Sequence, residues 1–266
     1  MTDLTLRGYE YVRTRLLDSI AEVGRISLLV IDTFRMLVRG LRAYRLVVEQ
    51  MHAIGVQSLM LVFIVSLFTG AVAAVQAAYQ FSNVVPLKYI SSVILRSVII
   101  ELGPVLTALI VGGRVGASIA AELGTMRVTE QIDALEAMAI NPVRYLVVPR
   151  VVAAVVMLPM LTVLADAIAI FGGYVVSVTT VGVSTHAYVV GLKQFFYFKD
   201  LWSGLIKAFF FGGIIGWMGC YYGFRTEGGA EGVGVATTRA VVSSCVQVLI
   251  SDYVLANVLF RFIFTS

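Results

Sequence analysis

Charged residues are scarce in this chain. Lys, Arg, Asp and Glu make up 14% of its 266 residues, whereas about a quarter is usual in soluble globular domains. No charged residue occurs between His52 and Lys88, and Asp166 is the only one between Val151 and Thr185. Because about 20 consecutive apolar residues span a bilayer as a helix, these gaps exclude an ordinary soluble domain and predict an integral membrane protein.

Cysteine and histidine are also nearly absent. The two cysteines, Cys220 and Cys245, lie in apolar segments, and the two histidines are His52 and His186. Neither set has the spacing of a metal site or of a disulfide framework. The sequence contains no HExxH or GxSxG motif. We therefore expect no catalytic residue, no metal site and no cofactor in this chain.

A nucleotide-binding loop is missing as well. No GxxxxGK[ST] segment, the glycine-rich loop that binds ATP phosphates, occurs in the chain. Any ATP-driven activity therefore needs ATP and Mg²⁺ bound on a separate ATPase subunit. The net charge of +4 is modest, and its uneven distribution fits membrane orientation better than nucleic-acid binding. No nucleic-acid partner is expected.

The remaining pattern predicts an all-α membrane protein in two parts. Residues 1–50 alternate apolar side chains with Arg and acids, which is typical of an amphipathic helix lying at the membrane interface. A soluble helix packed on a partner is the alternative. Residues 51–266 form a membrane domain with five transmembrane helices. We expect these spans at 53–79, 89–118, 147–178, 201–224 and 238–262.

The distribution of Lys and Arg predicts the orientation. With the N-terminus inside, the cytoplasmic segments hold 14 of these residues and the outer segments hold 4, and positive charge normally gathers on the cytoplasmic side. We therefore expect a cytoplasmic N-terminus and an outward-facing C-terminus. The inner set is the eight arginines of residues 1–50 with Arg114, Arg127, Arg144, Arg150, Arg225 and Arg239, and the outer set is Lys88, Lys193, Lys199 and Arg261.

Small residues recur every four positions in the segment GGRVGASIAAELG, residues 112–124. One row consists of Gly112, Gly116, Ala120 and Gly124, and a second row beside it of Gly113, Ala117 and Ala121. Such rows let two helix backbones approach closely, because no side chain holds them apart. We expect a neighbour within the same chain, although a neighbour in a second copy fits the pattern too.

Several acids lie inside the predicted spans. Glu101 lies three residues before Pro104. A carboxylate within the hydrocarbon region of the membrane costs free energy, so Glu101 should face a cavity or a cation. Lys207 and Arg96 are its candidate partners, and a purely structural ion pair predicts the same pairing. Pro104 removes a helical hydrogen bond and should kink the second span. Asp166 and Asp252 are further candidates for interior polar contacts or for the edge of a water-filled crevice.

The outer end of the first span combines polar and aromatic residues. These are Gln76, Tyr79, Gln80 and Phe81. An interfacial aromatic belt, which anchors many membrane helices at the headgroup level, is the simplest interpretation.

An acidic, helix-forming segment, TMRVTEQIDALEAM, connects the second and third spans on the predicted cytoplasmic side. We expect a short helix over about 125–140, with Thr129 as its N-cap and with Glu130 and Asp133 in the first turn, where the helix dipole favours acids. Asn141-Pro142 should end it. Val128, Ile132, Leu135 and Ala139 share one face, and an apolar face combined with acids favours docking onto a soluble partner.

The segment ELGPVLTALIVGGRVGASIAAELGTMRVTEQIDALEAMAINPVRYLVVPRVVA resembles the signature region of the MlaE family of ABC-transporter permeases. The resemblance continues through LPMLTVLADAIAIFGGYV, LIKAFFFG and ATTRAVVSS, and covers most of residues 50–260. It implies a homodimer in the inner membrane with cytoplasmic ATPase subunits beneath it and a periplasmic ring of MCE domains above it. The implied substrate is phospholipid, exchanged between the inner and outer membranes.

The resemblance also assigns expected roles to individual residues. Glu101 and Lys207 match charged family positions near the lipid cavity, and Arg239 matches an arginine at the inner surface. The family often has Arg directly before the glutamate; here that residue is Ile100, and Arg96, one turn away, is the available substitute. The region of Gln76, Tyr79, Gln80 and Phe81 aligns with lipid-contacting residues. The segment that matches the coupling helix, which enters a groove on the ATPase, contains Thr129, Glu130, Gln131, Asp133 and Glu136.

Two other functions are compatible with the composition. An ion-coupled secondary transporter could use Glu101, Asp166 and Asp252 as proton carriers, although the chain shows no inverted repeats or paired broken helices. A scaffold that only anchors soluble partners leaves the intramembrane charges without a role.

Overall fold

The fold is a bundle of long helices. The computed structural model describes residues 2–41, 44–81 and 89–264, and in these residues it contains helices and turns and no strand. Five helical stretches are long and apolar enough to cross a membrane: Tyr44–Gln80, Ile90–Val128, Val143–Thr179, Phe198–Phe224 and Gly229–Phe262. The all-α fold with five candidate transmembrane helices is therefore confirmed, and the chain is a multi-pass membrane protein.

Several of the long stretches contain a 3₁₀ or π-helical turn. The first consists of α2 (Tyr44–Gly55), a 3₁₀ turn and α3 (Leu59–Phe81). The second consists of α4 (Ile90–Ser97), a π-helical turn (Val98–Leu102), α5 (Gly103–Val111), another π-helical turn (Gly112–Gly116) and α6 (Ala117–Val128). The remaining helices are α1 (Thr2–Gly40), α7 (Gln131–Ala137), α8 (Val148–Thr179), α9 (Thr185–Phe195), α10 (Phe198–Phe224) and α11 (Gly229–Leu259).

The helical boundaries differ from the predicted spans at several places. The first and fifth stretches begin about nine residues earlier than predicted, at Tyr44 and Gly229, because the helix continues beyond the apolar core through segments that contain Arg45, Glu49 and Glu231. The sequence also gave no expectation for α9, whose N-cap Ser184 accepts a hydrogen bond from the Ala187 amide at 3.2 Å. Within α9 the Tyr188 hydroxyl donates to the Ile170 carbonyl at 3.1 Å, and burial raises the pKa of Tyr188 to about 12.

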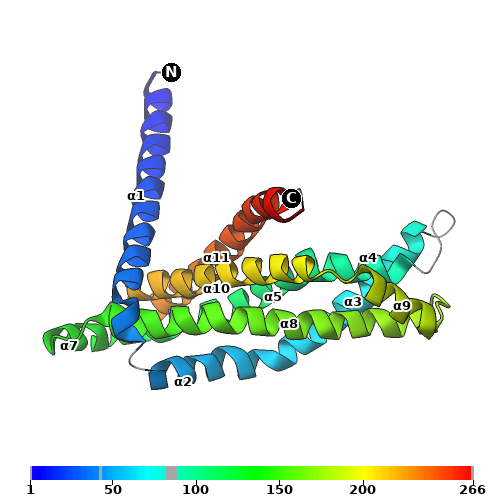
Figure 1. The fold of residues 1–266 in the computed structure, drawn as a ribbon. Helices are drawn as coiled ribbons and strands as arrows, with labels where there is room; N and C mark the ends of the chain where they lie inside the picture. The colour runs from blue at the N-terminus through cyan, green and yellow to red at the C-terminus, as the bar shows by residue number, and fades with distance from the viewer. Residues whose placement is uncertain (1, 42–43, 82–88, 265–266) are drawn as a thin grey trace.

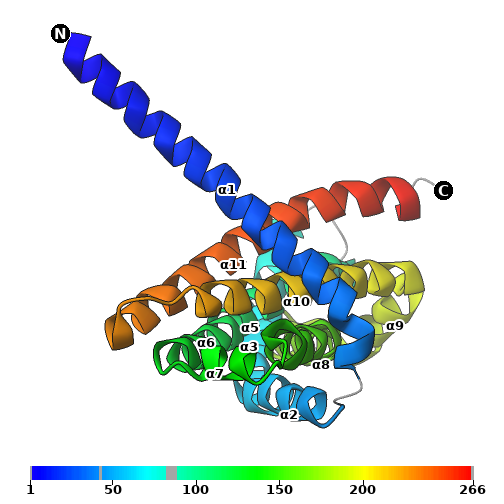
Figure 2. The ribbon, with the colours of Figure 1, turned by 90° about the vertical axis from the view of Figure 1, so that its left-hand side faces the viewer.

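The N-terminal helix α1 crosses one end of the bundle. It runs roughly at right angles to α8 and α10 and extends well beyond them (Figures 1 and 2). α7 lies at this same end, whereas α9 lies at the opposite end (Figure 1). A helix perpendicular to the spans is parallel to the membrane plane, so this direction fits the predicted interfacial position of α1, which stays a prediction.

Glycines bring α3 and α8 into backbone contact. A Cβ atom on Gly70 would lie 1.7 Å from the Ala169 carbonyl oxygen, and one on Gly172 would lie 2.3 Å from the Leu67 carbonyl oxygen. Only hydrogen fits in these gaps, so the two helices pack as closely as membrane helices can. This contact fixes α3 against the centre of the bundle.

The first row of small residues packs within the chain, as expected. A Cβ atom on Gly112 would meet Ile215 of α10 at 3.4 Å, and one on Gly124 would meet the Thr226 hydroxyl at 2.6 Å. In the second row, Gly113 has nothing within 4 Å of its Cβ position. The first row therefore packs against α10 and the segment that follows it, and Gly113 of the second row faces the open side of the bundle.

The second span departs from regular α-helix just before Pro104. The π-helical turn Val98–Leu102 ends where Gly103 and Pro104 begin α5. Such turns accommodate an extra residue in the helix and occur often at functional sites. Glu101 lies in this turn, so the local backbone irregularity and the intramembrane acid coincide.

Gly70→Ala should destabilise the protein by about 1–3 kcal/mol, because the added methyl group meets a backbone carbonyl that can move only with its helix. The measurement is thermal unfolding of the purified full-length protein in detergent. Gly113→Ala is the matched control and should change the stability by less than about 0.5 kcal/mol. Equal stability of the two variants would contradict the close contact of α3 and α8.

Candidate functional site

One lysine in the middle of α10 joins three helical segments. The Lys207 ammonium lies 2.7 Å from Glu101 Oε1, in the π-helical turn, and 3.0 Å from Asp252 Oδ1, in α11. We refer to Glu101, Lys207 and Asp252 as the ion cluster. The sequence offered Lys207 and Arg96 as candidate partners of Glu101; the structure pairs Glu101 with Lys207 and adds Asp252 as the second carboxylate.

Burial differs strongly across the ion cluster. The Lys207 side chain is 1% exposed and that of Asp252 is 20% exposed, whereas that of Glu101 is 45% exposed. A charge at membrane depth is costly unless it is paired, and two carboxylates at about 3 Å supply that pairing. Because Lys207 is sealed and Glu101 is not, Glu101 is the member of the cluster that meets whatever enters from outside.

Two cavities meet at Glu101. One, of about 280 Å³, lies between the π-helical turn, α10 and the end of α11 and is lined by Ile100, Glu101, Ser203, Lys207, Ala256, Asn257, Leu259 and Phe260. The other, of about 500 Å³, lies along α4 and is lined by Ser92, Val93, Arg96, Ser97, Ile100, Glu101 and Phe195. Both are lined mainly by apolar groups with a few charges, as binding cavities commonly are.

Arg96 is not a partner of Glu101. Its Nε donates to Asp200 Oδ2 at 3.1 Å, and its guanidinium lies 5.9 Å from the centre of the Tyr197 ring. Asp200, in the first turn of α10, is 2% exposed and holds Arg96 at the outer edge of the larger cavity. The expectation that Arg96 pairs with Glu101 is wrong, because the buried Asp200 carboxylate holds its guanidinium. The sequence feature that could have indicated this pairing is Asp200, an acid flanked by aromatic residues at the start of a span.

Asp166 lies apart from the ion cluster. It is 5% exposed and forms no ion pair among the described residues. A Cβ atom on Gly103 would lie 1.7 Å from Asp166 Oδ1, so the carboxyl packs directly on the α5 backbone. Asp166 Oδ1 is buried and has no hydrogen-bond partner among the described residues, so neither role expected from the sequence, an interior polar contact or the edge of a water-filled crevice, is shown.

The outer end of α3 borders a separate apolar groove. This groove, of about 580 Å³, is lined by Ile64, Val65, Phe68, Thr69, Val72, Ala73, Gln76 and Leu102. Gln76, Tyr79 and Gln80 are exposed, and the side chain of Phe81 lies outside the described residues. The structure does not bring these residues to the ion cluster; only Leu102, next to Glu101, links the groove to it in sequence.

The connection between the second and third spans differs from the predicted helix in its ends. Thr129 ends α6, and its hydroxyl donates to the Thr125 carbonyl at 2.8 Å. α7 starts after Glu130, whose φ of 59° breaks the helix, and the Glu130 side chain makes no capping hydrogen bond. The prediction of Thr129 as N-cap is therefore wrong, because the preceding span continues up to it. Asp133, as predicted, is in the first turn of α7.

The two faces of α7 have different surroundings. Ile132 is 2% exposed and, with Leu135, packs against the core of the bundle. Thr129, Glu130, Gln131, Asp133 and Glu136 are exposed. Asp133 forms an ion pair with Arg127 of α6. The apolar face thus anchors α7 to its own bundle, and the polar face remains available at the surface.

Comparison with known proteins decides the family. The family model described as "Permease MlaE" matches residues 47–258, which contain the ion cluster and all but the outermost residues of the first and fifth spans. The chain belongs to the MlaE permease family.

Individual relatives agree with this family. A probable ABC transporter permease protein of Rickettsia typhi is 45% identical over 216 residues, covering 81% of this chain and 83% of the relative. A probable ABC transporter permease protein of Synechocystis is 40% identical, covering 86% and 88%. The intermembrane phospholipid transport system permease protein MlaE of Haemophilus influenzae is 36% identical over 218 residues, covering 82% and 84%.

Lys207→Met should destabilise this MlaE-family permease by about 3–5 kcal/mol, because two carboxylates at membrane depth lose their shared cation. Thermal unfolding in detergent measures the loss. The triple variant Glu101→Gln, Lys207→Met and Asp252→Asn removes all three charges and should recover most of the stability. A single variant as stable as the wild type would show that Lys207 does not neutralise the cluster.

Proposed function

We propose that this chain is the permease subunit of an ABC transporter that moves phospholipids between the inner and outer membranes. Membership of the MlaE permease family over residues 47–258 carries the proposal, and the relative from Haemophilus influenzae is named for intermembrane phospholipid transport. The chain itself performs no catalysis in this scheme. ATP and Mg²⁺ are bound by a separate cytoplasmic ATPase subunit.

The shape of the site suits an amphiphilic substrate. The two cavities at Glu101 combine apolar walls with the ion cluster and with Arg96, so a headgroup can meet charge while acyl chains contact hydrocarbon. The neighbouring groove on α3, which ends at Gln76, is apolar. In the proposal, Glu101 adjusts the polarity of the cavity, Lys207 keeps the cluster neutralised, and Gln76, Tyr79, Gln80 and Phe81 border the path of the lipid.

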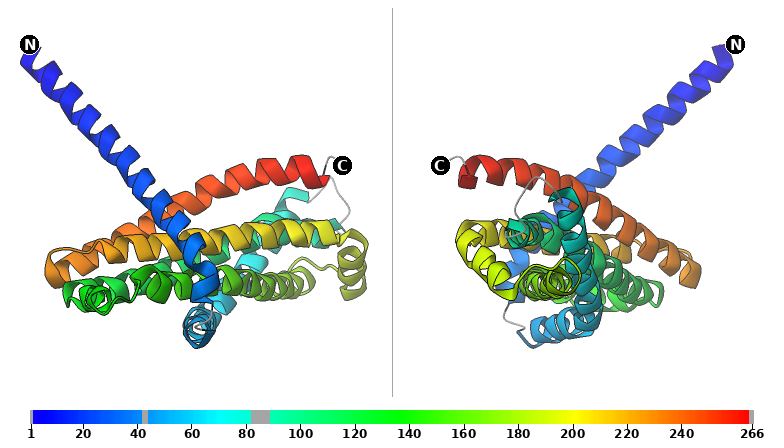
Figure 3. Two further views of the ribbon diagram at one scale, coloured as in Figure 1. Left: turned by 60° about the vertical axis from the view of Figure 1, so that its left-hand side comes forward. Right: turned by 90° about the vertical axis from the view of Figure 1, so that its right-hand side faces the viewer.

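A second copy of the chain is proposed to complete the cavity. Exposed apolar side chains follow α11 along its length, among them Val242, Val246, Leu249 and Tyr253. The C-terminal end of α11 also diverges from α10 (Figure 3). A homodimer would cover this helix and enclose the open cavities between two copies.

The arrangement of the two bundle ends supports an orientation. α7 and most of the arginines are at one end, which the excess of positive charge assigns to the cytoplasm. The opposite end, with α9, would then face the periplasm and the proposed MCE-domain partner. In the proposal, the protein lies in the inner membrane with a cytoplasmic N-terminus and a periplasmic C-terminus.

Purification with native partners, followed by reconstitution, tests the proposal. We expect an ATPase and an MCE-domain protein to co-purify, and lipid transfer in proteoliposomes to require ATP. The alternative is an ion-coupled transporter in which Glu101, Asp166 and Asp252 carry protons. That alternative predicts transfer driven by a pH gradient without any ATPase, and such a result would overturn the proposal.

Charge reversal on α7 should uncouple the ATPase. Glu130→Lys combined with Glu136→Lys changes two exposed acids and leaves the Asp133–Arg127 pair intact. We expect at least a tenfold loss of ATPase co-purification, since like charges across an interface cost several kcal/mol, with normal amounts of the permease in the membrane. Glu49→Lys, an exposed acid on α2, is the control. Undiminished co-purification of an active ATPase would contradict the assignment of α7.

A further inference from the structure

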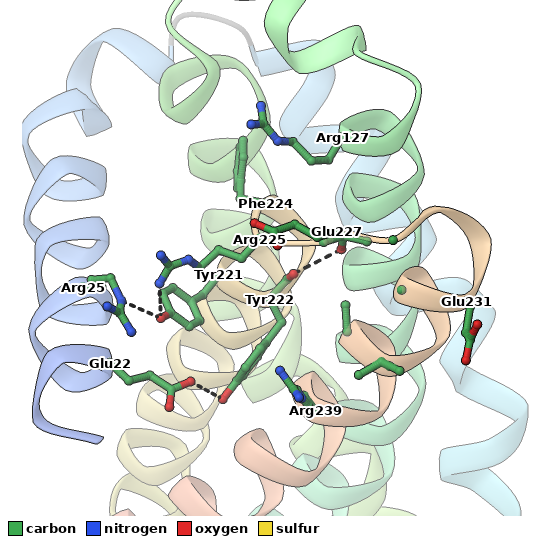
Figure 4. A pocket seen from close by; sticks show the side chains of 15 residues that line it. Glu22, Arg25, Arg127, Tyr221, Tyr222, Phe224, Arg225, Glu227, Glu231 and Arg239 are labelled. Atoms are coloured by element: carbon green, nitrogen blue, oxygen red, sulfur yellow. Dashed lines mark hydrogen bonds between the residues drawn. The ribbon is translucent and has the colours of Figure 1, made fainter. Parts of the chain in front are cut away.

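A large cavity lies at the α7 end of the bundle, opposite the ion cluster. It has a volume of about 880 Å³ and is bounded by α1, the ends of α6 and α10, and the start of α11 (Figure 4). Four arginines, Arg25, Arg127, Arg225 and Arg239, and three glutamates, Glu22, Glu227 and Glu231, line it. The lipid path proposed above involves none of these residues.

Two adjacent tyrosines organise one wall of this cavity. The Tyr221 hydroxyl accepts hydrogen bonds from two guanidinium groups, from Arg225 Nη1 at 2.8 Å and from Arg25 Nε at 3.5 Å. The Tyr222 hydroxyl donates to Glu22 at 3.0 Å. The two tyrosines therefore contact opposite charges (Figure 4): Tyr222 holds Glu22, and the guanidinium groups of Arg25 and Arg225 converge on Tyr221.

The opposite wall adds further positive potential. Arg239 is exposed and forms no ion pair or hydrogen bond within the described part of the chain. α11 begins about three helical turns before Arg239, after Gly228, whose φ of 86° comes with no capping side chain, and Glu231 lies in its first turn. The N-terminus of a long helix carries partial positive charge and free N–H groups. Glu231 points away from the tyrosine pair (Figure 4), and the four arginines of the lining outnumber its three glutamates by one.

We propose that this cavity binds a phosphate-bearing anion, and that the anion regulates α7. Guanidinium groups bind phosphate oxygens through paired, charge-assisted hydrogen bonds. Arg225 and Arg239 are the principal ligands. The headgroup of an anionic phospholipid and a soluble phosphate compound share this chemistry.

The link to α7 passes through Arg127. This arginine lines the cavity and forms the ion pair with Asp133. A bound anion competes with Asp133 for the Arg127 guanidinium. Occupancy of the cavity therefore weakens the Arg127–Asp133 ion pair and makes the polar face of α7 more mobile. Anion binding in this way affects the surface where the ATPase is proposed to dock.

Native mass spectrometry of the full-length protein in detergent tests the site. Phosphatidylglycerol and phosphatidylcholine with identical acyl chains are the probes, and inorganic phosphate and glycerol 3-phosphate are the soluble competitors. We expect the anionic lipid to bind about tenfold more tightly, as the loss or gain of one charge-assisted contact implies. Competition by millimolar soluble phosphate identifies a soluble ligand, and its absence identifies the lipid headgroup.

Variants separate this site from general surface charge. Arg225→Gln with Arg239→Gln should abolish the preference, and Arg239→Gln alone, which removes no contact within the described residues, should reduce it. The control, Arg35→Gln with Arg45→Gln, removes two exposed arginines outside the cavity and should retain it. Equal binding of both lipids without phosphate binding, or equal behaviour of the cavity and control variants, would overturn the site.

Hydrogen exchange tests the link. Anion binding should speed amide exchange in residues 131–137 of the wild type, and this response should disappear in Arg127→Gln. Unchanged exchange in α7 with the anion bound would overturn the regulatory part of the proposal. Neither experiment measures lipid transfer or ATP hydrolysis, so failure here leaves the proposed permease function untouched.

Discussion

The packing of the helices around Lys207 depends on the pairing of its buried ammonium group. A cation at that depth needs carboxylates within about 3 Å, and Glu101 and Asp252 supply them from two other helical segments. The three segments must therefore meet at one point. The π-helical turn before Pro104 brings Glu101 to that point while leaving almost half of its side chain open to the cavities.

The two ends of the bundle have different structural features. At one end, apolar cavities meet the ion cluster, which suits an amphiphile. At the other, Ile132 anchors a short helix whose acids remain at the surface. Close backbone contacts such as those at Gly70 and Gly172 make α3 and α8 a stiff unit between these ends. Rigid, tightly packed spans can transmit a displacement of α7 along their length, because packed cores shift between discrete arrangements and resist continuous deformation.

The predictions that failed share a physical cause. Arg96 was expected beside Glu101 because it lies one turn away on the same helix, but Asp200, distant in sequence, is a buried carboxylate and holds its guanidinium more closely. Thr129 was expected to begin α7 because Thr is a good N-cap, but the preceding helix continues to Val128, and the helix breaks instead at Glu130. In both cases a tertiary or neighbouring element overrode a sound local preference.

The sequence by itself determined the membrane class, the five spans, the absence of a nucleotide-binding loop, the need of Glu101 for a partner with two candidate cations, and an acidic helix between the second and third spans. These features depend on composition, local periodicity and the cost of charge in hydrocarbon, which are properties of short segments. Only the tertiary structure decided that Asp252 completes the ion cluster, that Arg96 binds Asp200, and that four arginines from α1, α6 and the α10–α11 region line one cavity. These contacts join residues up to 200 positions apart, and only the packing of the helices brings such residues together.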